Sequence, residues 1–127
     1  MSASGPYEFE IDVLTQYLEE QSEPRRDHYV FAYTIEIFNR GDRAAQLISR
    51  HWIITDALSQ IQEVKGEGVV GEQPVIKPGD SFQYTSGCPL PTPVGTMKGH
   101  YTFVGADGDS FEVEIPEFVL SMPRTLH

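Results

Sequence analysis

Three glycines in the middle of the chain have the spacing G-x-G-x-x-G, which is typical of loops that cradle phosphate groups. Glycine allows a backbone to approach an anion closely and to turn its N–H groups toward it. Basic side chains lie directly before this motif and on the strand expected to precede it, where they could supply positive charge if the two segments pair. The candidate anion site therefore comprises Lys65, Gly66, Gly68, Gly71, Arg50 and His51.

The residues around the motif do not support a dinucleotide site. Such a site needs a helix that opens within the glycines, because the helix N-terminus holds the pyrophosphate. Val69-Val70 favours a strand, and Gln73-Pro74 blocks a helix. Two interpretations remain open. The glycines form a bulged or sharply bent hairpin, or they form a small anion-binding nest, with Glu67 and Glu72 opposing the anion.

No other part of the sequence combines the residues that catalysis or metal binding needs. Cys88 lacks the strand-to-helix elbow of an activated nucleophile. Asp107-Gly108-Asp109 resembles the start of a calcium loop, but Glu112 stands where that loop requires glycine. The histidines lack the spacing of a zinc site and are expected to be surface or interface residues; they are His28, His51, His100 and His127. We therefore expect no catalytic residue, no metal site, no cofactor and no enzymatic activity.

Composition limits the partners and the compartment. Nine Lys and Arg residues against 19 Asp and Glu give a net charge of -10, which repels nucleic acids and anionic membranes. The single cysteine, Cys88, excludes an internal disulfide and fits a reducing compartment. The N-terminal residues lack a charged leader and an apolar segment, and no apolar run approaches the ~18 residues of a membrane span. We expect a cytoplasmic protein that binds neither nucleic acid nor membrane.

Alternating apolar and polar residues predict short strands separated by frequent turns. The chain of 127 residues suits one domain, with an ordered core at about residues 7–120. Cys88–Pro93 contains three prolines and is predicted to be an extended surface loop. The fold class is all-β, an antiparallel immunoglobulin or fibronectin type III-like β-sandwich of seven to eight strands. Its clearest strands are expected at Tyr7–Val13, His28–Asn39, Ala44–Asp56, Met97–Phe103 and Phe111–Ile115.

Five segments of the chain together form a recognisable set: Ser49–Asp56, Val64–Pro74, Lys77–Gly79, Tyr84–Cys88 and Gly95–Tyr101. With them the chain resembles the ApaG domain family, over nearly its whole length from Tyr7 to the region of Phe118. The resemblance implies a fibronectin type III-like sandwich without an established enzymatic activity. For the bacterial members it implies a link to cobalt and magnesium tolerance or efflux, and a gene that often neighbours a diadenosine tetraphosphate hydrolase.

The resemblance also bears on the glycine motif. In the family this motif has been discussed as a pyrophosphate-binding loop, and it corresponds here to Gly66, Gly68 and Gly71. Lys65 stands where many members are expected to have arginine, which replaces a bidentate phosphate fork with a point charge.

We therefore expect a non-catalytic ApaG-domain binding module. Similar eukaryotic domains occur in an F-box protein and a polymerase-interacting protein, where protein binding is inferred. The expected partner is a protein, bound through the hairpin from Arg50 to Gly71 or through an exposed edge strand. The alternative is a phosphate, pyrophosphate or nucleotide bound by the glycine-rich loop. The oligomeric state is left open.

Overall fold

Regular alternation along residues 29–39 determines how the first sheet packs. In β2 (Tyr29–Asn39) the odd-numbered side chains are buried and the even-numbered ones are partly exposed. Tyrosine, phenylalanine and isoleucine occupy the buried positions from Tyr29 to Ile37, as a strand with one covered face requires. The strands β1 (Phe9–Tyr17) and β6 (Ser81–Leu90) pair with β2 on either side, and both pairings are antiparallel.

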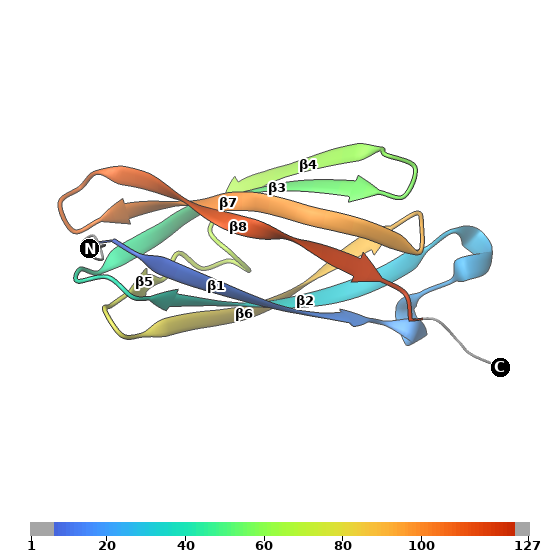
Figure 1. Cartoon of the computed structure of the whole chain (residues 1–127), viewed down its shortest axis with the longest axis horizontal. Helices are drawn as coiled ribbons and strands as arrows, with labels where there is room; N and C mark the ends of the chain where they lie inside the picture. Colours follow the sequence, from blue (N-terminus) through green and yellow to red (C-terminus); the bar gives the residue numbers. More distant parts are fainter. Residues whose placement is uncertain (1–6, 124–127) are drawn as a thin grey trace, which may run out of the picture.

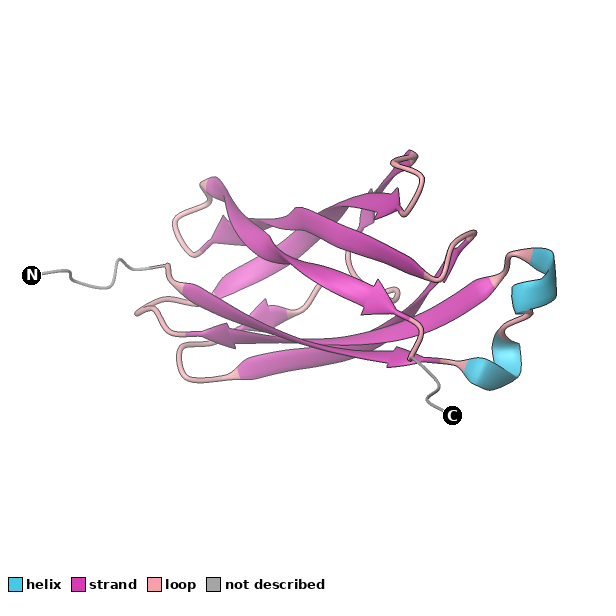
Figure 2. Cartoon of the chain, turned by 45° about the vertical axis from the view of Figure 1, so that its right-hand side comes forward, coloured by secondary structure: helices cyan, strands magenta, loops and turns pink. Residues whose placement is uncertain are grey.

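The second sheet is built around β3 (Ala45–Asp56). The strands of this sheet follow one another in the order β4 (Ile61–Glu67), β3, β7 (Val94–Gly105) and β8 (Ser110–Ser121). The short strand β5 (Val75–Ile76) pairs with one end of β3. In the computed structural model, which describes residues 7–123, the two sheets lie face to face (Figure 1). Single 3-10 turns at Glu19–Gln21 and Pro24–Arg26 connect β1 to β2 (Figure 2). The predicted antiparallel β-sandwich is confirmed, with eight strands.

An aromatic cluster fills the space between the sheets. Trp52 on β3 is only 2% exposed, and its ring centroid lies 5.4 Å from that of Tyr33 on the opposite sheet. The rings of Tyr101 and Phe118 approach Trp52 at 6.4 and 5.8 Å, nearly perpendicular to it. Edge-to-face contacts of this kind add to the stabilisation from burying apolar area. Trp52 therefore joins both sheets at the centre of the core.

The two sides of the sandwich differ. On one side β1 lies against β8, where Phe9 stacks on Phe111 with ring centroids 6.1 Å apart. On the other side the borders are β4 and β6, which are the end strands of their sheets. We call this second border the open side. Within residues 7–123, the outer edges of β4 and β6 have no strand partner there.

Two prolines show how the strands accommodate a missing N–H group. The prediction that Cys88–Pro93 forms a loop is wrong in part, because Cys88, Pro89 and Leu90 belong to β6. Pro89 lies opposite Val30 at a position whose backbone nitrogen faces away from β2, so no ladder bond is lost. Pro116 lies at a bulge, because the register of β7 and β8 shifts where it lies.

Candidate functional site

The glycine stretch closes a tight hairpin at the end of β4. The Val69 amide donates to the Glu72 carbonyl at 2.8 Å, and the Glu72 amide donates to the Val69 carbonyl at 2.9 Å. Val70 and Gly71, which lie between them, have φ angles of 42° and 81°. Positive φ at both central residues is the hallmark of a type I′ hairpin turn. The structure thus has the bent hairpin, and the amides of Val69 and Glu72 are used within it.

Gly66 leaves room for the side chain of Arg50. A Cβ atom at residue 66 would lie 2.8 Å from the Arg50 Cζ atom and from both of its Nη atoms. The guanidinium therefore packs directly against the Gly66 backbone. Its Nη1 donates to the carbonyl oxygens of Glu67 at 3.1 Å and Gly68 at 2.9 Å. The glycine motif thus holds the Arg50 guanidinium in place through two carbonyl oxygens on one of its nitrogen atoms.

A β-bulge decides which way Arg50 points. Ile48 has no register partner on β7, so the inward positions of β3 change from odd to even residue numbers at this point. Arg50 consequently shares the inner face with Trp52, whereas His51 faces outward. His51 lies opposite Lys65 in the pairing of β3 with β4. The Arg50 side chain thus lies on the inner face, and those of His51 and Lys65 lie on the outer face. Four residues of the predicted anion site nevertheless border one open depression of about 420 Å³: Arg50, His51, Lys65 and Gly66.

A cavity of about 250 Å³ opens between the sheets beside Arg50. We call it the inter-sheet cavity. Polar and apolar atoms contribute equally to its wall. Both strands of the open side contribute to it. It is lined by Tyr33, Arg50, Trp52, Ile54, Gln62, Val64, Ser86, Gly87, Cys88, Pro89 and Met97.

The ionisable groups around this cavity are neutral, apart from Arg50. Burial raises the pKa of Tyr33, Tyr84 and Tyr101, although the Arg50 guanidinium acts in the opposite direction on each of them. Burial also raises the pKa of the Cys88 thiol to about 11. The thiol therefore stays protonated at neutral pH, which does not fit an activated nucleophile.

A histidine pair that the sequence did not reveal lies on the outer face of the second sheet. His51 and His100 are register partners on β3 and β7, and their ring centroids are 5.1 Å apart. His51 Nε2 lies 2.9 Å from a carboxylate oxygen of Glu63, and His100 Nε2 lies 3.4 Å from one of Glu112. Pairing across 49 residues depends on the register of the sheet.

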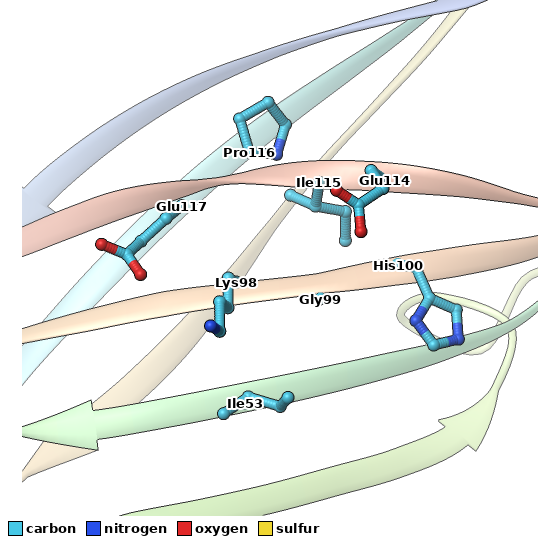
Figure 3. A pocket seen from close by; sticks show the side chains of 8 residues that line it. All are labelled: Ile53, Lys98, Gly99, His100, Glu114, Ile115, Pro116 and Glu117. Atoms are coloured by element: carbon cyan, nitrogen blue, oxygen red, sulfur yellow. The ribbon is translucent and has the colours of Figure 1, made fainter.

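The outer face is hollowed beside this pair. A depression of about 350 Å³ lies over β7 and β8, where the Lys98 and His100 side chains project from β7 (Figure 3). Glu114 and Glu117 border it from β8, on either side of the bulge at Pro116 (Figure 3). The mixed charges make this surface polar and suit a solvated face.

The remaining candidate residues do not form a cluster. His28 is exposed and pairs with Glu23 in an isolated β-bridge, and His127 lies outside the described residues. Within residues 7–123, no group of three or more His, Cys, Asp or Glu side chains is arranged to hold a metal ion. In the same part of the chain, no helix has the length and apolar character to cross a membrane.

Known proteins resemble this chain over its whole length. A sequence model of the ApaG domain matches residues 19–105. Protein ApaG of Thiobacillus denitrificans is 60% identical over 127 residues, covering 100% of both chains. Protein ApaG of Bordetella pertussis is 59% identical over 122 residues, covering 96% of this chain and 93% of the relative. A crystal structure of a Bordetella pertussis protein described as ApaA superposes with a TM-score of 0.93 at 57% identity, covering 97% of this chain and 100% of that one.

Proposed function

Because the chain belongs to the ApaG domain family, we propose that it is a non-catalytic binding module whose partner is a protein. The proposal includes a cytoplasmic setting. It also includes the link of the family to cobalt and magnesium tolerance, with the module acting on metal handling through its partner. The observation that carries the proposal is the unpaired edge of β4 on the open side.

The hydrogen-bonding groups of β4 alternate between the sheet and solvent. The Asp56 amide donates to the Gln60 carbonyl, and the Gly68 amide donates to the Ile48 carbonyl. In an antiparallel pair these bonds recur at every second residue, so the even-numbered residues of β4 bond to β3. The N–H and C=O groups of residues 61, 63 and 65 and the N–H group of residue 67 then point away from the sheet, whereas the Glu67 carbonyl accepts from Arg50. Such a row can accept an extended segment of another protein as an added strand.

Exposed apolar side chains lie at one end of this edge. Ile61 begins β4 and is 68% exposed, and Leu58 in the preceding turn is 71% exposed. The other strand of the open side, β6, carries Pro89, whose nitrogen faces outward and cannot donate to an added strand. Charged residues farther along β4 would discourage nonspecific pairing and select the partner. The edge of β4 is therefore the better of the two edges for a specific partner.

Replacing Lys65 by proline should abolish partner binding without unfolding the sandwich. The amide of residue 65 faces outward, so proline leaves the ladder between β3 and β4 intact and removes a donor for an added strand. Affinity capture from the lysate of a bacterium that carries the gene is the measurement. Lys65→Thr is the matched control, because it removes the same charge and keeps the N–H group. A folded Lys65→Pro variant that captures the same partner as the control would contradict the edge-strand proposal.

Binding of a small phosphorylated anion at the hairpin is the second candidate function. The amides of Val70 and Gly71 have no acceptor within residues 7–123, and the turn presents them at the surface. Calorimetric titration with pyrophosphate, ATP and diadenosine tetraphosphate, each with and without Mg²⁺, should then give saturable heat. Absence of heat at millimolar ligand would eliminate this candidate.

A further inference from the structure

We propose that the inter-sheet cavity binds a small monocarboxylate with an apolar body, and that Arg50 holds its carboxylate group. This inference concerns the interior of the open side and is independent of strand addition at the edge of β4. It depends on three properties of the cavity: an arginine without a carboxylate partner, apolar side chains along part of the wall, and a volume that fits one small molecule.

Arg50 has donors that the protein does not use. Its Nη1 is occupied by two carbonyl oxygens, which hold the guanidinium in place. Within residues 7–123, no carboxylate forms an ion pair with Arg50, and its other N–H groups have no protein acceptor. The guanidinium remains charged at any physiological pH. A fixed cation with a free fork matches the two oxygens of a carboxylate.

The walls indicate what the rest of the ligand is like. Trp52, Ile54, Val64 and Met97 give the cavity an apolar surface that favours a hydrocarbon body. The indole N–H of Trp52 has no acceptor, and it is the only fully buried side-chain polar atom in the described chain without a partner. That nitrogen is fully buried and is not exposed to the cavity, so the free donors of the lining belong to Arg50. The free donors of Arg50 and the apolar side chains favour a ligand that combines acceptor oxygens with a carbon skeleton.

The volume limits the size of the ligand. An apolar cavity of about 150 Å³ holds benzene, and the inter-sheet cavity measures about 250 Å³. It therefore has room for an aromatic ring or branched chain with one carboxylate, about ten non-hydrogen atoms by the same proportion. A nucleotide is too large. A phosphate dianion carries two negative charges, and Arg50 can neutralise only one of them. Burying the second charge without a partner costs more free energy than burying a carboxylate paired with Arg50.

Access to the cavity is available from the open side. Gln62 and Val64 on β4 and the segment Ser86–Pro89 on β6 belong to its lining, and these are the end strands of the two sheets. In Figure 1, β4 is the outermost strand of its sheet. A small ligand can thus enter between the two strand edges without separating paired strands.

The indole N–H of Trp52 provides a direct test in the full-length protein. The chain has one tryptophan, so a ¹H–¹⁵N spectrum contains a single indole signal that reports from the cavity wall. Sodium benzoate should shift this signal saturably, and benzamide, its neutral counterpart, should bind about tenfold more weakly because it lacks the charge. Equal binding of the two compounds, or no shift with benzoate at millimolar concentration, would overturn the proposal. So would a response to inorganic phosphate alone.

Variants distinguish the cavity from the outer surface. Val64→Phe fills the cavity and Arg50→Lys removes the fork while keeping a charge, so each should weaken benzoate binding about tenfold or more. Lys65→Thr, on the outer face, should bind benzoate like the original protein. Benzoate binding that survives Val64→Phe and is lost in Lys65→Thr would place the site outside the cavity and overturn the proposal. If Val64→Phe or Arg50→Lys does not fold, the comparison of benzoate with benzamide in the unmodified chain decides.

Discussion

Trp52→Ala should lower the free energy of unfolding by about 3–5 kcal/mol, the range for removing a large aromatic ring from a packed core. Trp52 is 2% exposed and its ring contacts Tyr33 from one sheet and Tyr101 and Phe118 from the other. Its removal leaves a cavity that two hydrogen-bonded sheets cannot readily close. Urea unfolding followed by far-ultraviolet circular dichroism measures the loss, because the backbone signal remains when the tryptophan is removed.

Trp52→Phe is the matched variant and should be much milder, with less than half of the loss seen for Trp52→Ala. Phenylalanine keeps an aromatic ring among its neighbours and removes an N–H group that has no acceptor. An unsatisfied buried donor costs about 1–3 kcal/mol, so its removal offsets part of the lost packing. Equal losses for the two variants would contradict this account and would show that the indole N–H makes a stabilising bond.

The strand pattern predicted the fold because burial on one face leaves a local signature. In β2 every second residue is buried, and this alternation can be seen without knowledge of any partner strand. Pro89 was misplaced for a related reason. Proline excludes a residue from a central strand, but at the edge of a sheet its nitrogen can face solvent, and strand order cannot be read from local sequence.

The candidate site was harder to predict. It depends on which residues of β3 face inward and on the register in which the strands pair. Ala45 and Leu47 are buried, so uninterrupted alternation would have placed His51 inside and Arg50 outside. The extra residue at Ile48 reverses this assignment. Nothing in the local sequence marks the bulge. The pairing of His51 with His100 likewise arises from the register of β3 with β7, which is set by contacts across the whole sheet.

The G-x-G-x-x-G pattern has a structural basis that differs from phosphate binding. Gly66 makes room for the Arg50 guanidinium, and Gly71 lies in the hairpin turn. Gly68 has a φ of 63°, and a Cβ atom there would lie 2.3 Å from the Glu72 carbonyl oxygen. The spacing of the motif therefore follows from one hairpin that packs against one arginine. This explanation predicts that the glycines differ in their tolerance of substitution.

Gly68→Ala should lower the free energy of unfolding by about 2–5 kcal/mol, from a left-handed backbone conformation together with a collision against a hydrogen-bonded carbonyl. Gly71→Ala is the matched control: it has a φ of 81°, but no atom lies within 4 Å of the position its Cβ would take. Its loss should be limited to the backbone term of about 1–2 kcal/mol. Urea denaturation measures both.

Because the Arg50 Nη1 binds the Gly68 carbonyl, Gly68→Ala should also shift the indole signal of Trp52, whereas Gly71→Ala should not. Equal losses would mean that the hairpin relaxes around residue 68 and that the motif requires glycine there for another reason.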